Sequence, residues 1–179
     1  MSVGGWERSL ALIWPRCPRC GKDFIRRAYL EGFFDHLLSL AFLYPLRCQV
    51  CTYRFRVLRF GLGHSTQVPD RRQYQRIATA FPVFLEGQQN REEQVTDLSM
   101  GGCTMKAKTS LSEGTFLQLL LQPSDREPPI QVDTAIVRSV RSKSVGLQFL
   151  EFPAGEKDRL SQFMYSLLVS SRAAPEVSH

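Results

Sequence analysis

The sequence predicts a mainly β protein: six antiparallel strands in a small β-barrel or sandwich, with a C-terminal α-helix, preceded by a small module that contains a helix. Three observations lead to this fold class. Six short strand candidates, separated by turn sequences, follow one another within residues 79–152, a spacing typical of small barrels and sandwiches. Apolar residues at helical spacing follow the last strand candidate. Two CxxC cysteine pairs precede the first strand candidate.

The strand candidates alternate between apolar and polar residues, as in Val132, Thr134 and Ile136. They are expected at residues 79–85, 94–98, 103–108, 115–122, 130–140 and 145–152. Glycine-rich turns such as Gly101-Gly102 separate them. After Pro153 the period changes to that of a helix, which we expect to cover one opening or edge of the barrel; its apolar positions are Leu160, Phe163, Met164, Leu167 and Leu168.

Charge divides the chain into two modules. Residues 1–63 hold ten Lys/Arg and four Asp/Glu, which accounts for the whole formal net charge of +6. We therefore expect a basic module at 1–60, a linker at 61–70 that is rich in glycine and small polar residues, and the barrel domain at 71–179.

A cytoplasmic protein without a membrane span is expected. The start of the chain lacks the long apolar run of a secretory leader. The most apolar stretch, residues 33–46, is interrupted by Asp35 and His36 and is shorter than the roughly 20 residues that a membrane helix needs. In the cytoplasm, paired cysteines more often hold a metal than form disulfides.

Two motifs bracket the first predicted strand of the barrel. Arg72 and Arg76 form an RxxxR pattern before it, and Asp97, Ser99 and Gly102 form a DxSxxG pattern after it. Arginine binds phosphate through a planar fork and stacks on purine faces. A carboxylate accepts hydrogen bonds from the edge of a guanine, a hydroxyl donates or accepts, and glycine permits close approach of the backbone. These residue types suit a ligand that combines phosphate groups with hydrogen-bond donors.

Together these motifs, the strand order and the final helix resemble the PilZ domain family over about residues 70–170. The resemblance implies a PilZ-like barrel that binds the bacterial second messenger cyclic di-GMP at Arg72, Arg76, Asp97, Ser99 and Gly102, with Arg71 adding charge beside the motif. It implies a receptor in bacterial signalling that converts ligand binding into a conformational change. The structural alternative is an ordinary Asp-x-Ser turn and a solvated arginine face.

The four N-terminal cysteines resemble the two knuckles of a zinc ribbon. Cys17 and Cys20 form one CxxC pair, and Cys48 and Cys51 the other, with Thr52 where ribbons often have glycine. Four thiolates leave no open position on the metal, so a structural zinc is expected. Cys103 lies in a predicted strand and is interpreted as a core residue.

Partners of the basic module are less defined. Its arginines alternate with aromatic residues, a pattern found on nucleic-acid surfaces, but we interpret it as ribbon strands with aromatic cores and solvated arginines. The stretch 33–46 predicts a helix that docks a protein partner. The alternative function is therefore a zinc-ribbon module that binds nucleic acid or protein beside a barrel that does not bind nucleotide. An enzyme is not expected, because the three histidines form no catalytic pattern.

Overall fold

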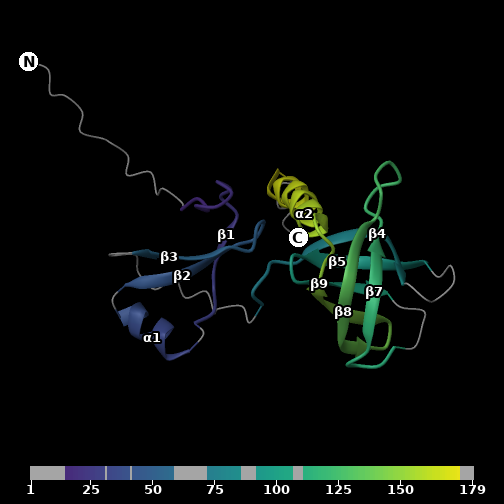
Figure 1. Cartoon of the computed structure of the whole chain (residues 1–179), viewed down its shortest axis with the longest axis horizontal. Coiled ribbons are helices and arrows are strands. Elements are labelled where there is room, and N and C mark those ends of the chain that lie inside the picture. Colours follow the sequence, from purple (N-terminus) through teal and green to yellow (C-terminus); the bar gives the residue numbers. More distant parts are fainter. Residues whose placement is uncertain are drawn as a thin grey trace, which may run out of the picture.

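The computed structural model describes residues 15–30, 32–40, 42–58, 72–85, 92–106 and 111–173. Arg71 and the predicted linker at 61–70 lie outside these ranges. The strands of the described chain form two separate β-sheets, a small N-terminal sheet and a closed barrel (Figure 1).

The N-terminal sheet has three antiparallel strands in the order β1-β2-β3, with helix α1 between the first two. Asp35, in the first turn of α1, is buried and accepts hydrogen bonds from Arg54 and Arg56 of β3. These arginines are therefore engaged in ion pairs rather than fully solvated. The elements are β1 (Ile25–Arg27), α1 (Phe33–Leu40), β2 (Leu43–Cys48) and β3 (Arg54–Leu58).

The prediction of one docking helix over residues 33–46 is wrong in its extent. The helix ends at Leu40, and strand β2 begins at Leu43. Between them Phe42 has a φ of 58°, a left-handed conformation that turns the chain back along the sheet. Apolar composition alone cannot separate a short helix from a buried strand.

The barrel confirms the predicted architecture of six antiparallel strands. Its strands close in the order β4-β5-β6-β9-β8-β7, so two three-stranded meanders meet along the β6–β9 and β4–β7 seams. The strands are β4 (Ile77–Leu85), β5 (Glu92–Ser99), β6 (Gly102–Lys106), β7 (Phe116–Leu121), β8 (Ile130–Arg141) and β9 (Ser144–Glu151). Residues 107 and 108, predicted to extend β6, lie outside the described chain.

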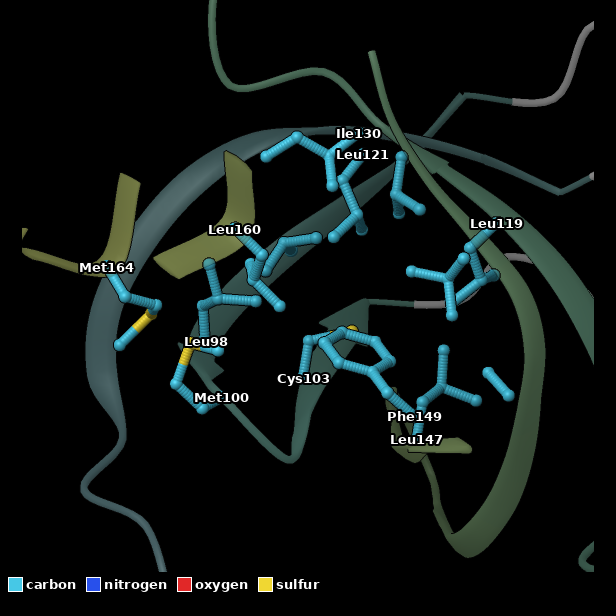
Figure 2. Packing of buried hydrophobic residues seen from close by; sticks show 14 of the residues in the cluster. Leu98, Met100, Cys103, Leu119, Leu121, Ile130, Leu147, Phe149, Leu160 and Met164 are labelled. Carbon is cyan, nitrogen blue, oxygen red and sulfur yellow. The ribbon is translucent and has the colours of Figure 1, made fainter. Parts of the chain in front are cut away.

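Helix α2 (Glu156–Ala173) covers one end of the barrel, as predicted. Leu160, Met164 and Leu168 are each buried to 99% or more, and Figure 2 shows Leu160 and Met164 directed toward the barrel core. Phe163 adds an edge-to-face contact with Phe81 of β4, with ring centroids 5.7 Å apart. Each large buried side chain contributes about 1.5–3 kcal/mol to folding, so this face anchors the helix.

An adjacent side of α2 contacts the N-terminal module. Phe24 packs edge-to-face on Tyr165 with centroids 5.8 Å apart, and the Lys22 ammonium lies 3.8 Å from the centre of that ring. Arg172 stacks over Phe24 and donates to Asp23 at 2.7 Å. The module and the barrel domain therefore share a packed interface along α2.

Neither described helix is long and apolar enough to cross a bilayer.

Candidate functional site

The two sequence motifs meet at one end of the first meander. Asp97 lies near the end of β5, opposite Ala78 of β4 and Thr104 of β6. The register between β5 and β6 shifts between Val95 and Asp97, leaving an extra residue in β5. Such a bulge re-aims the side chains beside it. It places Asp97 and Thr104 as a cross-strand pair next to the start of β4.

Arg76 joins this pair from the segment that precedes β4. Its Nη1 donates to Asp97 Oδ1 at 3.0 Å and to Thr104 Oγ1 at 2.6 Å. The side chains of Arg76 and Asp97 remain 32% and 28% exposed. Ion pairs with this access to water contribute only about 0–1 kcal/mol, so other polar groups can replace their contacts at small cost.

Ser99 and Gly102 have local structural contacts. The Ser99 hydroxyl is buried; it donates to Gly102 O at 3.0 Å and accepts from Gly101 N at 3.4 Å, which fixes the β5–β6 turn. A Cβ built on Gly102 would lie 2.0 Å from the carbonyl oxygen of Leu147 in β9. The close backbone approach at Gly102 is therefore to a neighbouring strand, whereas its predicted contact with a ligand stays a prediction.

The arginine segment, residues 72–76, contacts this turn through Tyr74. A Cβ on Gly101 would lie 2.6 Å from Cδ2 of the Tyr74 ring, so the ring lies directly on the glycine. Arg72 is exposed at the start of the segment. The structure thus brings together the RxxxR and DxSxxG motifs, but Arg71 lies outside the described chain.

Three residues at this site were missed by the sequence reasoning: Thr104, Tyr74 and Gln49. Thr104 is brought beside Asp97 by the register of the β5–β6 hairpin, and Tyr74 lies between the two arginines in the sequence. Gln49, from the N-terminal module, accepts a hydrogen bond from Gln75 N at 2.7 Å. No motif in the sequence indicates that contact.

The four N-terminal cysteines form a second cluster. Their sulfur atoms all lie within 4.8 Å of one another, with Cys17 and Cys51 at 3.5 Å and Cys20 and Cys48 at 3.6 Å. A tetrahedral zinc site with bonds of about 2.3 Å has sulfurs roughly 3.8 Å apart, so the donor set fits this metal.

The environment of these thiols is uneven. Burial raises the pKa of Cys48 and of Cys51. Burial also opposes ionisation of Cys17, but hydrogen bonds from the backbone of Cys20 and Arg19 outweigh it and lower the pKa of that thiol. The protons on buried thiols would have to leave when a metal binds, which makes metal affinity dependent on pH.

The two knuckles share a backbone conformation. Gly21 follows Cys20 with a φ of 70°, and Thr52 follows Cys51 with a φ of 63°. The departure from glycine noted in the sequence therefore leaves the local geometry unchanged. A β-branched residue adopts this conformation only under strain.

Cys103 is separate from this cluster and completely buried in β6, which agrees with its interpretation as a core residue. Burial is the main reason that the pKa of the Cys103 thiol is raised, to about 12.

The fold and the site define a class of small six-stranded barrel domain that carries an arginine segment in front of its first strand. The sequence profile of the PilZ domain matches residues 70–166. The chain belongs to the PilZ domain family. No curated protein matches it.

Solved structures are similar to this chain at low sequence identity. The Bacillus subtilis inhibitor of motility MotI/DgrA is 19% identical and has a TM-score of 0.51. The match covers 73% of this chain and 69% of the MotI/DgrA chain. The PilZ domain with c-di-GMP of YcgR from Escherichia coli is 18% identical, with a TM-score of 0.49 and coverage of 61% and 100%. YcgR in complex with c-di-GMP is 16% identical, with a TM-score of 0.48 and coverage of 83% and 75%.

Proposed function

We propose that this chain is a non-enzymatic receptor for cyclic di-GMP, with Arg71, Arg72, Arg76, Asp97, Ser99 and Gly102 at or around the ligand site. The observation that carries the proposal is the partly exposed Arg76–Asp97 pair at the junction of the two motifs. It presents a phosphate-binding cation and a guanine-binding anion on one open surface. Membership of the PilZ family supports the choice of ligand.

Roles differ among these residues. Arg72 and Arg76 would bind phosphate or stack on guanine, and Asp97 would accept from the guanine edge. Ser99 and Gly102 shape the turn beneath them, through the hydroxyl bond to Gly102 O and the close approach to β9. Arg71 would add positive charge.

Calorimetric titration with cyclic di-GMP tests the proposal. Wild-type protein should bind, and Arg72→Ala or Arg76→Ala should weaken binding by about 10- to 150-fold, because each removes a charge-assisted contact of about 1.5–3 kcal/mol. Arg126→Ala is the matched control, since Arg126 is exposed in the β7–β8 loop. Unchanged affinity in both motif variants contradicts the site. A parallel titration with duplex DNA tests the nucleic-acid alternative.

We also infer that Cys17, Cys20, Cys48 and Cys51 hold one structural zinc ion. The compact sulfur cluster supports this, and the four thiolates leave no position for a substrate. Freshly reduced protein should carry about one zinc per chain by elemental analysis. Cys48→Ser should lose most of it, whereas Cys103→Ala, the matched control, should keep it. Metal-free wild-type protein would contradict the assignment.

The effector step is a proposal of the same kind. Ligand binding would move residues 72–76 together with Gln49 and so change how the N-terminal module sits, provided that the ligand binds one arrangement better than another. The contact of Gln49 with Gln75 supplies a route between the two parts. Hydrogen exchange should change at residues 72–76 and within residues 15–58 when ligand is added. A change confined to the barrel contradicts this step.

A further inference from the structure

The stretch between the two motif arginines is held by the N-terminal module. The side-chain oxygen of Gln49 accepts from Gln75 N at 2.7 Å, and its Nε2 donates to Gln73 O at 3.5 Å. The same Nε2 donates to Arg47 O at 3.3 Å. One amide side chain thus bonds to the backbone on both sides of Tyr74.

Gln49 is itself firmly placed. It is 3% exposed and stands inside the second knuckle, between Cys48 and Cys51. Its backbone N–H donates to Phe24 O at 2.8 Å, and the N–H of Val50 donates to the sulfur of Cys48 at 3.4 Å. Buried polar groups of this kind have one well-defined orientation, because leaving them unbonded costs the full desolvation penalty.

Tyr74 adds a second contact between the arginine segment and the N-terminal module. Its hydroxyl accepts from Arg47 Nη1 at 3.1 Å, and the Arg47 guanidinium carbon lies 5.4 Å from the centre of its ring. The ring also lies on Gly101 of the β5–β6 turn. Residues 73–75 are therefore held between the second knuckle and the DxSxxG motif, with Arg72 and Arg76 immediately outside.

We propose that Gln49 is a positioning residue for the arginine segment, so that the cysteine cluster and the ligand site are energetically coupled. The inference rests on the proposed function, in which this segment binds cyclic di-GMP. A segment that is already ordered loses less conformational freedom when it closes on a ligand. Coupling between two sites is reciprocal in binding free energy, so the ligand should in turn stabilise the second knuckle.

Gln49→Met tests the role, because methionine has a similar shape without the hydrogen bonds. Removing two hydrogen bonds to the segment should raise the dissociation constant for cyclic di-GMP about 5- to 30-fold. Gln118→Met, an exposed position of β7, is the matched control and should bind as wild type does. The full chain is used throughout, with melting curves to confirm folding.

Hydrogen exchange of the ligand-free protein distinguishes a local effect on the arginine segment from a general loss of stability. Gln49→Met should speed exchange at Gln75 N–H much more than at the barrel strands. Tyr74→Phe offers a second variant, because it removes the hydroxyl and leaves the ring on Gly101. It should weaken binding about 2- to 10-fold.

The outcomes separate the two proposals. Wild-type protein that fails to bind cyclic di-GMP overturns the proposed function. Wild-type protein that binds, together with Gln49→Met and Tyr74→Phe variants that bind within twofold of it, overturns the positioning role alone. Should Gln49→Met fail to fold, Tyr74→Phe decides between the same two results.

Discussion

The backbone seam at Gly102 permits a quantitative test by Gly102→Ala. Gly102 begins β6 and pairs with Gln148 of β9, and its built Cβ lies 2.0 Å from Leu147 O and 3.1 Å from Gln148 Cα. Both atoms belong to the backbone, so no side-chain rotation can relieve the clash. The two strands must separate by about 1 Å to restore ordinary packing distances.

The cost can be estimated from the contacts that this separation disturbs. Overpacking costs about 1–3 kcal/mol. Weakening two backbone hydrogen bonds between β6 and β9 adds about 1–3 kcal/mol. We therefore expect Gly102→Ala to lower the free energy of unfolding by about 2–6 kcal/mol, a large part of the 5–15 kcal/mol typical of a domain.

Urea denaturation followed by circular dichroism measures this change. With a slope of about 2 kcal/mol per molar urea, the midpoint should fall by roughly 2 M. Gly155→Ala is the control: Gly155 has a φ of 83° but open space at its Cβ, so only conformational strain of about 1 kcal/mol is expected. Equal effects of the two substitutions would refute the reasoning. A stable Gly102→Ala protein that no longer binds cyclic di-GMP would give Gly102 a direct ligand role.

Three further outcomes are expected. Thr52→Gly should raise the free energy of unfolding by up to about 1 kcal/mol, because it relieves left-handed strain, and an equal gain in Thr52→Ala would contradict this cause. Met164→Ala should cost about 2–5 kcal/mol in the same urea assay, against less than about 0.5 kcal/mol for Val169→Ala on the exposed face of α2. Cys103, whose pKa burial raises to about 12, should stay protonated and unlabelled by an aromatic disulfide reagent at pH 8 until the barrel unfolds, as mass spectrometry would show.

Local patterns predicted the barrel and its covering helix well. Alternation along β8 and the helical spacing of Leu160 and Met164 both indicate that one face of the element is buried. Such patterns can be recognised within a short stretch of sequence. The division of residues 33–46 into helix and strand was missed, because it depends on the left-handed turn at Phe42 and on pairing of β2 with two other strands.

The candidate site was predicted in part for a similar reason. Arg76 and Asp97 are recognisable as motif residues, and the structure joins them. Thr104 enters the site only through the register shift beside Asp97, and Gln49 only through contacts 24 and 26 residues away. Such contacts are set by tertiary packing and have no periodic signal in the chain.

The division of the barrel into two meanders has a consequence for how the sequence can vary. Arg76, Asp97, Thr104 and the β5–β6 turn all belong to the first meander or to the residues just before it. The β7–β8 and β8–β9 turns belong to the second meander and carry exposed positions. Insertions and exchanges are tolerated best at exposed turns. Changes in the length and composition of those two turns should therefore leave the arrangement of Arg76 and Asp97 intact.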